Sequence, residues 1–146
     1  MAYTYCSYAD VVERLELADI GFPTATYTSA TIAPNQLSAE QLIYGKLNGY
    51  VKVDLFSTTV PLIITELCAD LAAYMVCSIV LGLDYFRIPD TIKSRKKNVA
   101  TKIEEMRNGE IYLGSSFEIA YEDYFVGNST KCFDFSTCTT SWFDIQ

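Results

Sequence analysis

Residues 60–83 read VPLIITELCADLAAYMVCSIVLGL, and the stretch contains only two charged residues, Glu66 and Asp70. Pro61 suits the first turn of a helix and Gly82 can end one, so the stretch predicts a single long helix. A helix that is apolar around its whole circumference must be buried on all sides. We therefore expect this helix to form either the centre of a helical bundle or a membrane span.

The two acidic residues favour the bundle. In a membrane span Glu66 and Asp70 would lie within the lipid, where a central acid is unfavourable by about 2.5–3.5 kcal/mol. The uninterrupted apolar run of residues 71–83 is also shorter than the ~20 residues that a span needs. We therefore expect a buried core helix, capped by Thr58 or Thr59. Its predicted core residues are Leu67, Leu71, Tyr74, Met75 and Ile79.

A short helix is predicted near the start of the chain. Ser7 is a good N-cap residue, and Val11, Val12 and Leu15 give the helix one apolar face. Residues 20–37 follow, and they contain two prolines and four threonines. This composition predicts an ordered loop with one extended stretch.

A second helix is predicted to begin at Ser38. Ser38 and Gln41 have the spacing of a capping box. The predicted apolar stripe consists of Leu42, Leu47, Tyr50 and Val51. Gly45 and Gly49 lie four residues apart, and each destabilises a helix by about 1 kcal/mol relative to alanine. We therefore expect these glycines to mark a close contact with another helix.

A fourth helix is predicted from Pro89 to Gly109. Its apolar stripe is narrow and consists of Ile92, Val99, Ile103 and Met106. Seven of the eleven basic residues of the chain lie in or beside this helix: Arg87, Lys93, Arg95, Lys96, Lys97, Lys102 and Arg107. We expect the helix to contact the bundle along one edge and to present a basic face outward.

The charge of the chain is unevenly distributed. The 146 residues include 18 acidic and 11 basic ones, for a net charge of −7. A protein that wraps a phosphate backbone is usually basic, so general nucleic-acid binding is disfavoured. Outside residues 87–107 the chain holds 4 basic and 15 acidic residues. One chain therefore carries both halves of a charge-complementary contact, as a head-to-tail ring requires.

The run Lys93-Ser94-Arg95-Lys96-Lys97 gives four candidate interface residues: Lys93, Arg95, Lys96 and Lys97. Three interpretations of this run remain open. A solvated helix face comes first, pairing with an acidic surface of a neighbouring subunit comes second, and contact with DNA comes third.

Metal and cofactor chemistry is not expected. The chain has no histidine, which removes the commonest metal ligand and the usual general base near neutral pH. The number of cysteines is odd, and no secretory signal is expected at the start of the chain, so free thiols in a reducing cytoplasm are predicted. These cysteines are Cys6, Cys68, Cys77, Cys132 and Cys138. Cys132 and Cys138, with five residues between them, lack a usual zinc spacing.

Glu66 and Asp70 are the candidate catalytic pair, since they lie four residues apart on one helix face. Paired carboxylates can divide acid and base roles when their surroundings separate their pKa values. No second catalytic motif accompanies them. We expect them instead to meet basic groups from the fourth helix or from a neighbouring subunit, and we expect that the protein is not an enzyme.

The last 32 residues differ from the rest. Residues 115–146 are rich in aromatic residues, threonine and serine, and they contain one basic residue, Lys131. Helix formers are few and β-formers are many, which predicts an extended arm that cannot form a core alone. We expect a helical domain over residues 1–114 and a docking arm over residues 115–146. The arm would bury Phe133, Phe135, Trp142 and Phe143 against a partner.

The order of these segments resembles the head–tail connector (adaptor) proteins of tailed bacteriophages. The resemblance covers residues 5–114 and rests on a pattern of helices. Its strongest segments are Pro61…Cys68-Ala69-Asp70-Leu71-Ala72-Ala73-Tyr74 and Ile103…Gly109…Leu113-Gly114. The family often has an arginine in the turn before the third helix, whereas residues 49–62 here contain none.

The resemblance implies a mainly α fold, a small bundle around one long buried helix with an extended C-terminal arm. It implies a structural protein of the virion neck, assembled in the host cytoplasm as a ring, commonly twelve-fold. The implied partners are further copies of the chain, the portal protein above, a tail-side neck or tail-terminator protein below, and DNA passing through the lumen, with no membrane. Two alternatives remain: a small DNA-binding or regulatory protein that uses the basic helix 87–107, and an acid–base enzyme that uses Glu66 and Asp70.

Overall fold

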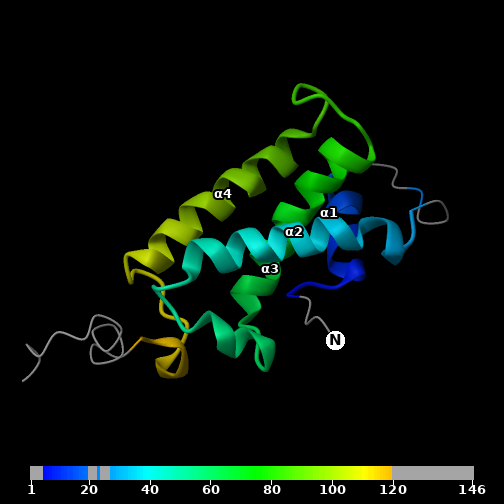
Figure 1. Ribbon diagram of the computed structural model, residues 1–146. Helices are drawn as coiled ribbons and strands as arrows, with labels where there is room; N and C mark the ends of the chain where they lie inside the picture. Colours follow the sequence, from blue (N-terminus) through cyan, green and yellow to red (C-terminus); the bar gives the residue numbers. More distant parts are fainter. Residues whose placement is uncertain (1–4, 20–22, 24–26, 120–146) are drawn as a thin grey trace, which may run out of the picture.

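The computed structural model describes residues 5–19, 23 and 27–119 of the chain, and these residues form a helical bundle (Figure 1). The α-helices are α1 (Tyr8–Leu17), α2 (Ser29–Leu47), α3 (Leu62–Met75) and α4 (Asp90–Arg107). The shorter segments are the 3₁₀-helices η1 (Val53–Ser57) and η3 (Ser115–Phe117) and the π-helical segment η2 (Val76–Val80). Helices α1, α2 and α4 all pack against α3. The predicted mainly α bundle around one central helix is therefore confirmed.

Helix α3 is the core helix that the apolar stretch predicts. Leu67 and Leu71 are buried, and the predicted core residues Tyr74 and Met75 are partly buried. The segment Leu62–Val80 is long and apolar enough to cross a membrane by length and composition alone, and more than half of it is buried inside the protein. A core helix passes the same test, so its packing accounts for its composition.

The end of this helix differs from the prediction. After Met75 the chain widens into the π-helical segment η2, where the N–H of Leu81 donates to the carbonyl of Val76 over 2.9 Å. A π turn contains one more residue than an α turn, so the buried face changes phase. Ile79, predicted to be buried, is therefore 68% exposed.

The start of α3 also differs in its cap. The N-cap residue is Pro61, without a side-chain cap, rather than Thr58 or Thr59. Thr58 instead ends η1, and its hydroxyl donates to the carbonyl of Leu55 over 3.0 Å. Gly82 follows the helical segments with φ at +60°, a conformation that favours glycine, as the sequence predicts.

The predicted N-terminus of α1 is confirmed. Ser7 is the N-cap residue, and it forms a capping box with Asp10. The predicted apolar face of Val11, Val12 and Leu15 is buried.

Helix α2 begins nine residues earlier than predicted, at Ser29, so the loop expected over residues 20–37 is wrong from residue 29 onward. Pro34 lies inside the helix, in its second turn. The hydroxyl of Ser38, the predicted N-cap residue, donates to the carbonyl of Pro34 over 2.8 Å. Ser38 is thus an interior residue that bonds back to the preceding turn.

The early start also changes the buried face of α2. The buried residues are Ile32, Asn35, Gln36, Ala39, Ile43 and Leu47. Only Leu47 belongs to the predicted stripe, whereas Leu42 and Tyr50 are each 48% exposed. The predicted contact at the glycines is wrong as well, because a Cβ on Gly45 would meet nothing within 4 Å. Gly49 lies beyond the helix with φ at +89°, where it permits the turn toward η1.

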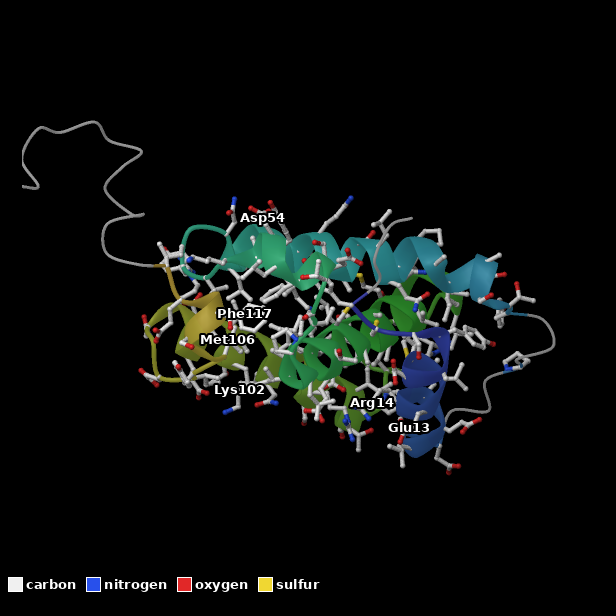
Figure 2. The ribbon with its side chains drawn as sticks, turned by 90° about the horizontal axis from the view of Figure 1, so that it is seen from below. Glu13, Arg14, Asp54, Lys102, Met106 and Phe117 are labelled. Atoms are coloured by element: carbon white, nitrogen blue, oxygen red, sulfur yellow. The ribbon has the colours of Figure 1, made fainter. Side chains whose placement is uncertain are left out.

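The predicted α4 is confirmed, with Ile92, Val99, Ile103 and Met106 all buried. Beyond it, the chain returns to the bundle at η3. The Phe117 carbonyl accepts from the N–H of Lys52 over 2.8 Å, and the Phe117 ring lies 5.5 Å from the Phe56 ring. Figure 2 shows Phe117 close to Met106 at the same end of the molecule, and the two line one hollow. The first residues of the predicted arm therefore pack on the core of their own chain.

Candidate partner interface

The four basic residues predicted to form an interface all lie on α4, but they face different surroundings. Lys93 pairs with Asp90 at 2.8 Å, and its Nζ lies 4.8 Å from the centre of the Tyr85 ring. Lys96 lies over the Tyr74 ring at 4.0 Å. Lys97 is exposed and has no acidic partner within the described part of the chain.

The pairing of Lys93 with Asp90 alters both groups. The Asp90 carboxylate raises the pKa of Lys93, and the Lys93 ammonium lowers the pKa of Asp90. The Asp90 side chain is 96% exposed, so the pair is open to water and adds little stability.

Arg95 turns toward the core. Its Nη1 lies 3.2 Å from Oδ1 of Asp70, and Nε of Arg14 from α1 donates to the same oxygen over 2.8 Å. Asp70 is only 6% exposed, so these two arginines supply the charge that its buried carboxylate needs. Figure 2 shows Arg14 on the side of α1 that faces the central helices. Asp70 therefore joins α1, α3 and α4.

The structure places Glu66 and Asp70, the candidate catalytic pair, in different surroundings. Asp70 meets a basic group of α4, as predicted, and Glu66 is exposed one turn earlier on α3. The two carboxylates do not share an environment. The contribution of Arg14 was not foreseen, because 56 residues separate it from Asp70.

Two further basic residues of α4 pair with glutamates of the same helix. Lys102 pairs with Glu105 at 2.7 Å. Arg107 pairs with Glu104 at 2.7 Å and donates to the hydroxyl of Tyr50 over 2.8 Å. Much of the positive charge predicted to face outward is therefore balanced within the chain, and Lys96 and Lys97 are the most available cations of α4 itself.

An apolar groove lies between α2 and α4. It has a volume of about 220 Å³ and is lined by Leu42, Lys46, Leu71, Lys96, Val99, Ala100, Ile103 and Glu104. Leu71 of the central helix belongs to this lining, and two lysines and a glutamate stand among the apolar residues. The sequence did not reveal the groove, because it depends on how two helices far apart in the chain are spaced.

A second hollow, of about 350 Å³, lies beside η1 and contains Tyr5, Glu40, Tyr44 and Asp54 among its lining residues. Burial raises the pKa of Glu40, and burial, followed by the charge of Glu40, raises the pKa of Tyr5 to about 12. The Tyr44 hydroxyl donates to Asp54 over 3.1 Å. Glu40 was not singled out in the sequence, since it has no motif around it.

Three of the predicted free thiols are described, and all three are free and buried: Cys6, Cys68 and Cys77. The Cys6 thiol donates to Sγ of Cys68 over 3.2 Å, and this hydrogen bond together with burial raises the pKa of Cys68. Burial raises the pKa of Cys77 to about 11. Such thiols behave as small apolar core groups. Cys132 and Cys138 lie outside the described residues.

The aromatic half of the predicted interface, Phe133, Phe135, Trp142 and Phe143, also lies outside the described residues.

The family of the chain follows from comparison with known proteins. A family model described as Bacteriophage Mu, Gp36 matches residues 5–120, which is most of the chain. No curated protein matches the chain, and no solved structure does. The chain is thus a phage protein. The chain belongs to the bacteriophage Mu Gp36 family.

Proposed function

We propose that the protein is a head–tail connector, a structural component of the virion neck that forms a ring beneath the portal and links it to the tail while DNA passes through. One observation carries the proposal: the phage family model covers residues 5–120, the range over which the helical bundle is built. The segment order that resembles connector proteins lies in the same range. The ring is proposed to be twelve-fold, and the virion neck is its proposed location.

The surroundings of the acidic residues support a structural role over catalysis. Asp70 is the acidic residue on the buried side of α3, and two arginines occupy its Oδ1 oxygen. An acid–base role needs a carboxylate that can exchange protons with a substrate. Asp70 is instead committed to holding helices together, so we propose that the protein is not an enzyme.

The charge balance supports a conduit that does not hold its cargo. The net charge of −7 repels a phosphate backbone, and most basic residues of α4 already have acidic partners in the chain. DNA can then pass a ring of such subunits without binding to it. The remaining cations, Lys96 and Lys97, are proposed to face the acidic surface of the next subunit.

The proposed partners are other copies of this chain, the portal protein, and a neck or tail-terminator protein on the tail side. The test is the native mass of the purified protein, alone and mixed with the portal ring. We expect discrete ring masses that bind the portal. Phage lacking the protein should produce heads and tails that do not join.

Either of two results would contradict the proposal. The first is a protein that remains monomeric with and without the portal ring. The second is salt-dependent retardation of duplex DNA by the monomer, abolished by reversing the charge of Lys96 and Lys97, which would favour a DNA-binding role.

A further inference from the structure

Phe86 is the most exposed of the large apolar side chains that the structure describes, at 91%. It lies in the connection between η2 and α4, in a turn that is held by its neighbours. The carbonyl of Asp84 accepts from the N–H groups of Arg87 and Ile88 over 2.8 and 3.2 Å, and Ile88 is buried. The exposure of Phe86 is therefore imposed by an ordered turn.

One neighbouring ring restricts Phe86 further. The Tyr85 ring lies 5.9 Å from the Phe86 ring in an edge-to-face arrangement. Nζ of Lys93, on α4, lies over the same Tyr85 ring. A side chain that is already fixed loses little freedom on binding. Aromatic residues, phenylalanine among them, are enriched at protein interfaces.

The groove between α2 and α4 offers a surface of matching chemistry. Leu42, Val99 and Ile103 give it an apolar lining. Ala100 contributes only a methyl group between them, which leaves room above the core helix. Its volume of about 220 Å³ can accept an aromatic ring.

Charged residues surround both surfaces, and their signs correspond. Asp84 is exposed two residues before Phe86, and Arg87 is exposed directly after it. Around the groove, Lys46 and Lys96 can face Asp84, and Glu104 can face Arg87, although Glu104 also pairs with Arg107. An apolar contact inside such a set of opposed charges is both favourable and specific in register.

We infer that Phe86 of one subunit inserts into the groove between α2 and α4 of a second copy of this chain. A subunit cannot fill its own groove. From Asp90, where α4 begins, to Val99 and Ile103 the helix rises about 14 to 20 Å, at about 1.5 Å per residue. Phe86 precedes that start, so the turn and the groove lie well apart along α4.

A contact between two different surfaces of identical chains is heterologous, and it closes into a ring when the rotation between neighbours permits. The inference therefore rests on the proposed ring and names the contact that would build it. It also gives Lys96 a specific acidic partner, Asp84 of the neighbouring copy.

Cross-linking tests the contact directly. Protein carrying Phe86→Cys is mixed with protein carrying Ala100→Cys, in the presence of the portal ring and oxidised glutathione. We expect disulfide-linked dimers whose peptide map joins position 86 of one chain to position 100 of the other. Wild-type protein, and a mixture of Tyr112→Cys with Ala100→Cys, control for the native thiols, since Tyr112 is also an exposed aromatic residue.

Assembly gives the second measurement. Phe86→Ala should weaken ring formation about tenfold or more, whereas Tyr112→Ala should leave it unchanged. This contact would be overturned if Phe86→Ala forms normal rings and the Phe86→Cys and Ala100→Cys mixture gives no 86–100 cross-link. The proposed ring would stand in that case. A map that joins position 100 to Cys132 or Cys138 would assign the groove to the C-terminal arm and would also overturn it. A wild-type protein that forms no ring removes the proposed function and this contact together.

Discussion

Nε of Arg14 lies 2.8 Å from Oδ1 of Asp70, so a single hydrogen-bonded ion pair joins the first helix to the middle of the central one. Arg95 reaches the same oxygen from α4 over 3.2 Å. The two arginines differ in exposure, with 16% of the Arg14 side chain and 38% of the Arg95 side chain accessible to solvent.

Asp70→Asn should therefore destabilise the fold by about 3 kcal/mol, because it leaves the largely buried charge of Arg14 with only the exposed Glu13 carboxylate, 3.9 Å away, to balance it. Arg95→Ala should have a smaller effect, about 1 kcal/mol, since Arg95 is partly screened by water. Denaturant unfolding measures both. Asp90→Asn is the matched control, as Asp90 is on the surface, and its effect should stay within about 0.5 kcal/mol. Equal effects at positions 70 and 90 would contradict a buried network.

Leu67 on the core helix is only 3% exposed. Leu67→Ala should therefore leave a cavity in the core and destabilise the protein by about 2–5 kcal/mol. Leu62→Ala makes the same change on the same helix at a side chain that is 74% exposed. Its effect should lie within about 0.5 kcal/mol. Thermal unfolding of the two variants side by side measures the difference, and similar losses would mean that α3 is not the core.

Two truncations separate the core from the arm. Protein ending at Ile119 should keep the helix content and melting temperature of the full chain, because the bundle and the Phe56–Phe117 contact remain. Protein ending at Gly114 should melt several degrees lower, since it loses that contact and the hydrogen bond from Lys52 to Phe117. Circular dichroism reports both. The protein ending at Ile119 is also expected to fail in binding the portal. Its normal incorporation into particles would contradict a docking arm.

Alkaline pH should destabilise the protein, partly through Cys77. The pKa of Cys77 rises from 9.0 to about 11 on folding, because the thiolate is unfavourable in the core. The stabilising effect of the neutral thiol is therefore complete below about pH 9 and is lost as pH rises toward 11, by up to about 1.4 kcal/mol per pH unit. Cys77→Ala should show a shallower fall of unfolding free energy between pH 9 and 11. Parallel curves would exclude this cause.

Reversing the charge of the available cations tests the subunit contact. Lys96→Glu combined with Lys97→Glu should weaken ring assembly, more strongly at low salt, because exposed charges are screened at high ionic strength. Lys93→Glu is less informative, as Lys93 is already paired with Asp90. Sedimentation at two salt concentrations measures the effect. Assembly that is indifferent to the double reversal would exclude charge complementarity at this face.

Local patterns in the sequence predicted several elements correctly. The N-cap at Ser7, the apolar composition of α3 and the narrow stripe of α4 are properties of short segments, and each of these helices begins close to the predicted residue. Helix α2 was placed too late because Pro34 suggests a loop, whereas the helix accommodates it within its second turn.

Other features depend on distances that a single sequence does not contain. The partnership of Arg14 with Asp70 joins residues on separate helices. The groove between α2 and α4 depends on how far apart those helices pack, and the exposure of Phe86 depends on the turn around it. Composition could have drawn attention to Tyr85 and Phe86 as adjacent aromatic residues between helices.

The π-helical segment Val76–Val80 has a consequence for how related chains can differ in length. Removing one residue there would restore an ordinary α turn and leave the buried residues of α3 before it in register. A π turn and an α turn each complete one revolution, so the segment after the deletion would keep nearly the same direction around the helix axis. The turn that carries Phe86 would then face the same way, on an unchanged core. The π turn is thus a place where a chain can lose one residue without altering how the subunit folds or where it presents Phe86.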